Sequence, residues 1–286
     1  MSNVVLPNAV VSNALVSSEV ASKIAESNAA ASSEVVPNVA MSRAELTICR
    51  LYPREMNIYG DMGNALVLQK RCERRGIGVS YSDHHPGNSF PSGIDIVLGG
   101  GGQDSGQIAV REDLARIASQ MKTLAYNNMP MLVICGMYQL FGSHFVTATG
   151  ETIKGLGILD LFTQAGDTRM IGNIITQSSE FGRIVGYENH SGRTWLGKDA
   201  KPLAEVVKGD GNNGKDKTEG ARLANVIGSY LHGPLLPKNP QIADFLILKA
   251  LENKYGSDNA KELMEACALD DSMAVNARTV AEQRPR

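Results

Sequence analysis

The sequence lacks the marks of several large classes of protein. Its four cysteines are far apart and form no Cys-x-x-Cys pair, which disfavours a disulfide scaffold or a zinc site and is typical of a reducing cytoplasm. No apolar run approaches the roughly 18 residues that a membrane helix needs, and the N-terminus has neither the basic start nor the apolar stretch of a secretory signal. We therefore expect a cytoplasmic protein that holds no metal and is not inserted in a membrane.

An excess of charge of one sign is also missing. Lys and Arg number 28, Asp and Glu number 30, and the formal net charge is −2. Bulk electrostatic attraction to nucleic acid or to an anionic membrane is therefore weak, and we expect no nucleic-acid partner.

Residues 1–44 contain few large apolar side chains and no aromatic residue. A stretch composed mainly of Ser, Ala, Val and Asn buries too little surface to offset the entropy of the chain. This predicts a disordered N-terminal tail over residues 1–44 and one folded domain over residues 45–286. Alternatively, Met41, just before the first predicted strand, is the true start.

From Glu45 onward, predicted strands alternate with helical patterns. The apolar runs LTICRLY, GVSYS, DIVLG and MLVI are the strands, and the helix after the third run is expected to be long, continuing to about Leu124. This alternation predicts an α/β fold with a mostly parallel sheet and helices on both faces. From about Ile153 the predicted strands are shorter, with Gly-rich turns. Active sites in such folds lie at the carboxyl ends of the strands.

Cys135 stands where the run MLVI ends and a predicted helix begins, with Gly136 after it. This places the thiol on a tight strand-to-helix turn. The unpaired N–H groups and the dipole at the start of a helix favour thiolate, which can attack an acyl carbon. The alternative is that Cys135 is a small buried hydrophobic residue.

A thiol nucleophile needs a base, and His232 is the best candidate. It follows the apolar strand in IGSYLHGPLL and so also lies at the carboxyl end of a strand. His190 is the second candidate, although a structural or substrate-orienting role suits it better. His84 and His85 lie in the polar segment DHHPG, where we expect them to be exposed.

Four consecutive glycines, Gly99 to Gly102, follow the third predicted strand. Because no side chains intervene, their N–H groups can approach an oxyanion together with the N–H of Gly136. The alternative is a glycine-rich turn that binds nothing.

The motifs GGGGQD, ICGMYQ, YENHSGRT and GSYLHGPLL together resemble those of the class I glutamine amidotransferases of the cobyric acid synthase type. The strings LYPREMNIYGDMGN, TRMIGN and GDGNNGKDKTEG are similar to the glutaminase subunits of lipid II isoglutaminyl synthases. The resemblance extends from about Glu45 to the C-terminus and implies a flavodoxin-like sheet.

The resemblance also implies a reaction. L-Glutamine would be hydrolysed to L-glutamate and ammonia through a thioester on Cys135, with His232 as acid and base. Arg169 would engage the glutamine carboxylate, unless it forms only a surface salt bridge. The full set of implied substrate-binding residues is Arg169, Gly101, Gly136 and Gln139.

Two positions depart from the pattern of many class I relatives. Met137 stands where those relatives have a glycine two residues after the nucleophile, so the pocket wall is expected to be bulkier. Pro234 stands where many have a glutamate two residues after the catalytic histidine. We therefore expect either a Cys–His dyad or an acid supplied by a partner subunit.

Ammonia alone does not amidate a carboxylate, because the carboxylate must first be activated. We therefore expect a partner that performs the activation. The segment KGDGNNGKDKTEG has the glycine and lysine spacing of a phosphate loop, but Asp216 replaces the hydroxyl residue, so we expect a hairpin or surface loop and no cofactor in this chain. The resemblance implies a separate Mur-ligase-like subunit that holds ATP and Mg²⁺ and amidates the D-glutamate of lipid II. The alternatives are the glutaminase of a corrinoid amidotransferase, an inactive amidotransferase fold that serves as a binding module, or a cysteine hydrolase of peptides or esters.

Overall fold

The computed structural model describes residues 44–285. The tail predicted for residues 1–44 therefore lies, but for its last residue, outside the described residues, as does the alternative start at Met41. Within residues 44–285, no helix is both long enough and apolar enough to cross a membrane.

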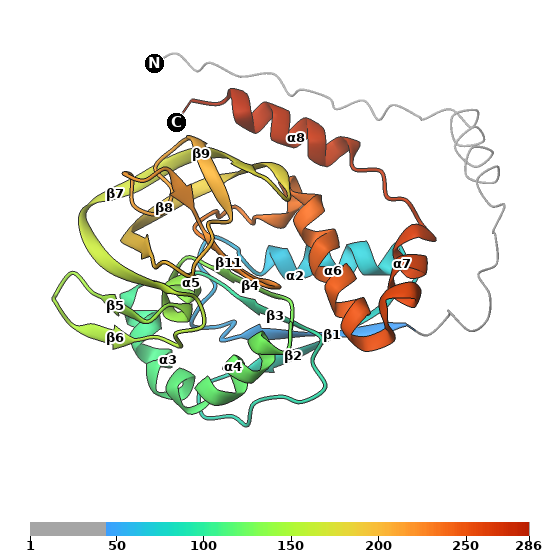
Figure 1. The fold of residues 1–286 in the computed structure, drawn as a ribbon, viewed down its shortest axis with the longest axis horizontal. Helices are drawn as coiled ribbons and strands as arrows, with labels where there is room; N and C mark the ends of the chain where they lie inside the picture. Colours follow the sequence, from blue (N-terminus) through green and yellow to red (C-terminus); the bar gives the residue numbers. More distant parts are fainter. Residues whose placement is uncertain (1–43, 286) are drawn as a thin grey trace, which may run out of the picture. The chain divides into compact units, whose positions relative to one another are not determined.

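A mostly parallel sheet forms the centre of the described chain, as the alternating pattern predicts (Figure 1). Its strand order is β11-β12-β4-β3-β1-β2, and each neighbouring pair runs parallel except β11 and β12. The strands are β1 (Glu45–Leu51), β2 (Gly78–His84), β3 (Ile96–Gly99), β4 (Met131–Ile134), β11 (Ala221–Leu223) and β12 (Val226–Ser229). Every residue of β3, β4 and β12 is buried, because helices cover a parallel sheet on both faces.

Helices α2 (Gly63–Glu73) and α6 (Pro240–Tyr255) lie on one side of this sheet, and α3 (Asp104–Arg116) and α4 (Ala118–Tyr126) lie on the other (Figure 1). The prediction of one long helix ending near Leu124 is wrong. The chain leaves helical geometry at Ile117, whose side chain is fully buried, and this residue separates α3 from α4.

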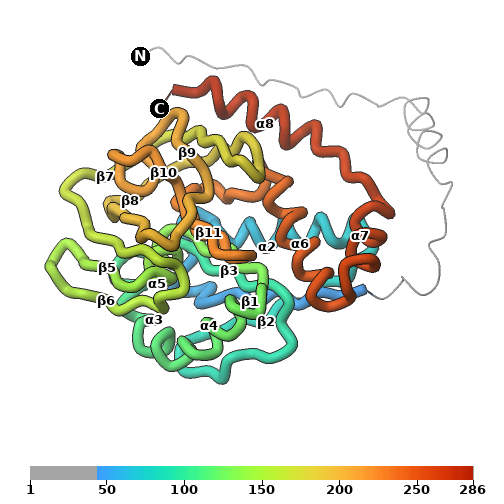
Figure 2. The backbone as a smooth tube through the Cα atoms, viewed as in Figure 1, coloured from blue at the N-terminus to red at the C-terminus, as the bar shows by residue number. Residues whose placement is uncertain are grey.

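A second sheet lies beside α5 (Gly136–Phe141), the short helix that follows β4 (Figure 2). Two of its strands are long, contrary to the shorter strands expected. They pair as an antiparallel hairpin whose register shifts between Ala165 and Met170. The strands are β5 (His144–Val146), β6 (Thr152–Lys154), β7 (Leu161–Ser178), β8 (Gly182–Leu196), β9 (Ala204–Lys208) and β10 (Thr218–Glu219).

The polar segment before Thr218 connects β9 to β10 as an antiparallel hairpin, which confirms the prediction of a hairpin there. After β12 come a short 3-10 helix (Leu236–Lys238), α6, α7 (Ser257–Glu265) and α8 (Ser272–Gln283). The carboxyl ends of β1, β3, β4 and β12 meet at one edge of the parallel sheet, and the candidate site lies there.

Candidate active site

Cys135 occupies a strained turn between β4 and α5. Its backbone has φ 50° and ψ −106°, a conformation that non-glycine residues rarely adopt. Residues with such strained backbones cluster at functional sites. Its N–H donates to the Ser229 carbonyl at 2.8 Å. The thiol lines a cavity of ≈ 350 Å³. The predicted strand-to-helix turn is confirmed.

Gly136 and the glycines after β3 pack too closely for side chains. A Cβ at Gly136 would lie 2.8 Å from the backbone N and O of Gly102. A Cβ at Gly101 would lie 2.8 Å from His232 Cε1 and 3.3 Å from Cys135 Cβ. Cys135, His232 and the glycine loop therefore lie together, as the positions of their strands predicted.

His232 is held from one side by a carboxylate. Its Nδ1 lies 3.1 Å from Asp61 Oδ1, and each side chain is 1% exposed. Because a carboxylate oxygen accepts, Nδ1 donates its proton to Asp61, and Nε2 is the ring nitrogen left to act on a substrate. No residue of the described chain forms a hydrogen bond with Nε2 in a good geometry, so this nitrogen is available to the reacting groups.

Burial alone would lower the pKa of His232, but the hydrogen bond to Asp61 and the nearby Asp61 and Cys135 side chains outweigh burial and raise the pKa to about 10. The imidazolium is thus stabilised between a carboxylate and a sulfur atom. A protonated imidazole beside the sulfur is the setting in which cysteine nucleophiles are activated in enzymes.

Asp61 corrects the expectation that the chain lacks its own orienting acid. It lies in the loop between β1 and α2, 171 residues from His232. It therefore reaches the imidazole from a different part of the fold than Pro234, which follows His232 by two residues in the chain. A carboxylate of the described chain therefore contacts His232 directly. The sequence signal was available, since Asp61 follows the first predicted strand within NIYGDMGN.

The prediction for Gly101 is wrong in one respect. Its N–H already donates to Asp61 Oδ2 at 2.7 Å, so it is not free to bind an oxyanion. Gly102, the next residue, lines the cavity and lies against Gly136. These two glycines are therefore the better placed pair of backbone donors.

Gln139 lines the same cavity and is held by two neighbours. Its Oε1 accepts from Gln107 Nε2 at 2.7 Å, and its Nε2 donates to the Tyr230 hydroxyl at 3.1 Å. Gln107 also donates to the Gly136 carbonyl at 3.0 Å. One amide proton of Gln139 remains for a ligand.

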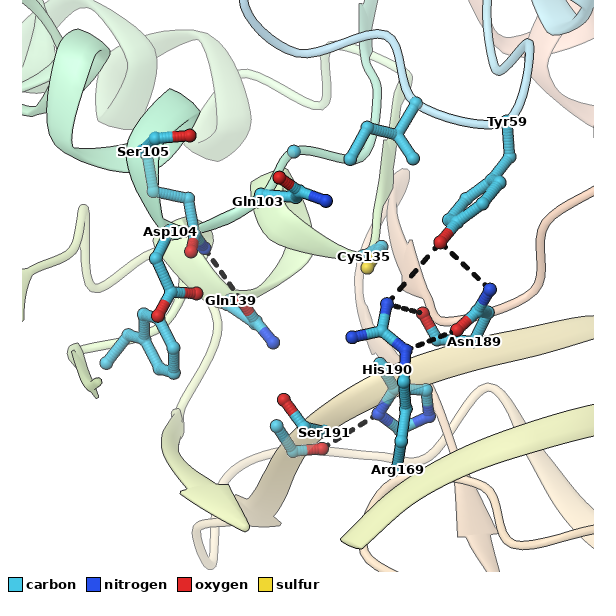
Figure 3. Close-up of a pocket in the computed structure, with 15 residues that line it drawn as sticks. Tyr59, Gln103, Asp104, Ser105, Cys135, Gln139, Arg169, Asn189, His190 and Ser191 are labelled. Atoms are coloured by element: carbon cyan, nitrogen blue, oxygen red, sulfur yellow. Dashed lines mark hydrogen bonds between the residues drawn. The ribbon is translucent and has the colours of Figure 1, made fainter. Parts of the chain in front are cut away.

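Arg169 lies in the irregular part of β7 and reaches the cavity mouth (Figure 3). Its Nε donates to Asn189 Oδ1 at 2.6 Å, and a terminal nitrogen lies 3.4 Å from the Tyr59 hydroxyl. It forms no ion pair with any residue from 44 to 285, which contradicts the surface salt bridge alternative. Neutral partners orient the guanidinium and leave its charge for an anionic ligand.

Comparison with known proteins agrees with this geometry. Residues 47–240 match the CobB/CobQ-like glutamine amidotransferase domain. The chain belongs to this amidotransferase family. It is 39% identical over 242 residues to the lipid II isoglutaminyl synthase (glutamine-hydrolyzing) subunit GatD of Staphylococcus aureus, covering 84% of this chain and 96% of the relative. The corresponding subunit of Streptococcus pneumoniae is 40% identical over 217 residues, covering 75% and 84%.

Other relatives share only part of their length with this amidotransferase. A probable cobyric acid synthase of Methanosphaera stadtmanae is 34% identical over 119 residues, which cover 37% of this chain and 24% of the relative. A crystal structure of a glutamine amidotransferase has a TM-score of 0.50 at 15% identity and covers 71% of this chain and 98% of that one. The fold is that of the class I glutamine amidotransferases.

The remaining histidines of the amidotransferase have other surroundings. His190 lines the cavity, stacks on Tyr230 with ring centroids 3.6 Å apart, and is held through Nδ1 by the Gly192 carbonyl. Burial lowers the pKa of His190 to about 3, so it stays neutral and is a poor base. His84 was expected to be exposed, but it is fully buried because its Nε2 pairs with Asp113 at 2.7 Å.

Sequence reasoning also missed the residues that position the site. Tyr59 places its ring edge-on to His232, with centroids 4.9 Å apart, and its hydroxyl accepts from Asn189 Nδ2 at 2.8 Å. Its loop also carries Asp61. Among residues 44–285, no three His, Cys, Asp or Glu side chains are grouped to hold a metal ion.

Proposed function

We propose that this amidotransferase is the glutaminase subunit of a lipid II isoglutaminyl synthase. It hydrolyses L-glutamine to L-glutamate and ammonia and passes the ammonia to a second subunit. The observation that carries the proposal is that Cys135, His232 and Asp61 meet beside a cavity whose arginine, Arg169, has no anionic partner among residues 44–285. The similarity to the GatD subunits over most of both chains supports the assembly.

In the first half-reaction, the Cys135 thiolate attacks the carboxamide carbon of glutamine. The oxyanion that forms is bound by the N–H groups of Gly136 and Gly102. The His232 imidazolium then gives its proton to the leaving nitrogen, the C–N bond breaks, and ammonia leaves a glutamyl thioester on Cys135. Asp61 stabilises the imidazolium and keeps Nε2 directed at the reacting atoms.

In the second half-reaction, neutral His232 takes a proton from water, and the hydroxide attacks the thioester carbon. The C–S bond breaks, the sulfur leaves as thiolate, and glutamate carries away the oxygen. Arg169 binds the α-carboxylate of the substrate. Gln139 donates its remaining amide N–H to the substrate as a hydrogen bond.

The ammonia needs an activated carboxylate, and we assign the activation to a Mur-ligase-like subunit that binds ATP and Mg²⁺. That subunit would amidate the α-carboxylate of D-glutamate in the stem peptide of lipid II. The support is that the GatD relatives are themselves subunits of a lipid II isoglutaminyl synthase. We place the complex in the cytoplasm, at the inner face of the membrane that holds lipid II.

The test is glutamate release by the full chain, measured alone and with the candidate synthetase, lipid II and ATP. Cys135→Ser is the control in every combination. Because the three catalytic groups lie in one chain, we expect release by the chain alone and faster release in the complete mixture, together with amidated lipid II. Release no greater than that of Cys135→Ser in all mixtures would refute the glutaminase, and glutamate release without amidated lipid II would refute only the assignment to lipid II.

A further inference from the structure

The cavity beside Cys135 carries one charge of each sign. Of the described side chains that line it, Arg169 is the cation and Asp104 is the carboxylate. His190 adds no charge, because burial lowers its pKa to about 3. An α-amino acid at neutral pH presents a carboxylate and an ammonium group on one carbon atom. The charges of the cavity therefore complement both groups.

Asp104 begins a helix that is tied to the turn at Cys135. It is the first residue of α3, and Gln107 follows three positions later on the same face of the helix. Gln107 is buried and donates to the Gly136 carbonyl at 3.0 Å and to Gln139 Oε1 at 2.7 Å. These bonds join the start of α3 to the residue that follows Cys135.

The carboxylate of Asp104 has no competing partner. It is exposed, and none of residues 44–285 forms a hydrogen bond or ion pair with its side chain. Figure 3 shows Asp104 and Arg169 on opposite sides of the pocket, with Gln139 between them. The start of α3 also favours a negative charge, but that effect does not require the side chain to line the cavity.

We infer that Asp104 is a specificity-determining residue that binds the α-ammonium group of L-glutamine while Arg169 binds the α-carboxylate. The inference rests on the proposed glutaminase function. Together the two contacts make the site selective for a free α-amino acid. Glutaramate, which has the carboxamide and the carboxylate but no amino group, lacks the group that Asp104 recognises.

The test compares Asp104→Asn with the wild-type full chain, and Glu112→Gln serves as the matched control because Glu112 is an exposed carboxylate of the same helix. The measurements are KM and kcat for L-glutamine and the inhibition constant of glutaramate against glutamine. Loss of a hydrogen bond to a charged group raises KM about tenfold. We expect that rise in Asp104→Asn, with kcat and the inhibition constant of glutaramate within about twofold of wild type and Glu112→Gln unchanged in every measurement.

Two results would overturn the inference: an unchanged KM for glutamine, or equal weakening of glutamine and glutaramate. A role limited to the helix dipole would instead lower the melting temperature and leave the ratio of the two constants unchanged, which also counts against the inference. If the wild-type chain hydrolyses no glutamine with or without its partner, the proposed function itself is wrong.

Discussion

Asp61 and His232 are joined across 171 residues by a hydrogen bond of 3.1 Å between Asp61 Oδ1 and His232 Nδ1. The other oxygen of the same carboxylate accepts the Gly101 N–H at 2.7 Å. One side chain thus fixes both the orientation of the His232 imidazole and the glycine loop beside Cys135. This relationship means that the described chain itself supplies a carboxylate to orient His232.

Asp61→Asn tests that relationship. The amide cannot stabilise an imidazolium and can present its N–H to Nδ1, which favours the wrong tautomer. We expect kcat for glutamine hydrolysis to fall by about 10²- to 10⁴-fold, the range that a positioned acid or base contributes. Asp258→Asn, at an exposed carboxylate in α7, should retain full activity. Activity of Asp61→Asn within twofold of wild type would show that the orienting acid lies elsewhere.

Tyr59→Phe tests how Arg169 is positioned. The change keeps the ring beside His232 and removes the hydroxyl that contacts Arg169 and Asn189. We expect KM for glutamine to rise about three- to tenfold, the usual effect of one lost hydrogen bond, with kcat nearly unchanged. Steady-state kinetics measure KM and kcat separately. Tyr126→Phe, at an exposed ring on α4, is the control. An effect confined to kcat would argue against this role.

The raised pKa of His232 predicts how stability depends on pH. The folded chain holds this proton more tightly than the unfolded chain, whose histidine titrates near the ordinary value of 6.5, against about 10 when folded. The contribution is therefore fully present below about pH 6.5 and is lost as the pH rises through about 10.

Denaturant unfolding of wild type and His232→Gln over this pH interval measures the contribution. The free energy of unfolding of wild type, taken relative to the variant, should decrease steadily as the pH rises. A difference that stays constant or grows would mean that the folded histidine does not bind its proton more tightly.

Much of the site followed from local sequence. The apolar runs predicted the parallel sheet, and a strand followed by Cys135 and Gly136 predicted the tight strand-to-helix turn. His232 was found because it follows a strand of the same sheet. These features depend on neighbours in the chain, so periodicity and turn chemistry are sufficient to predict them.

Contacts between distant loops could not be predicted in this way. Asp61 reaches His232 from another strand end, and Gln107 holds Gln139 from a different helix. His84 stands in a polar segment, but a buried carboxylate compensates its burial. In each case the tertiary fold determines which side chain forms the contact, and the spacing of residues in the sequence does not predict it.

Selective reaction of one thiol tests the central claim most directly. Burial raises the pKa of Cys49 and of Cys72 to about 12, so both remain protonated and unreactive at neutral pH. The full chain is treated with a diazo-ketone analogue of glutamine, and the adduct is located by peptide mass spectrometry. We predict a single adduct on Cys135 that is blocked by excess glutamine and is absent from Cys135→Ser. An adduct on another cysteine, or labelling of Cys135→Ser equal to that of wild type, would contradict the account.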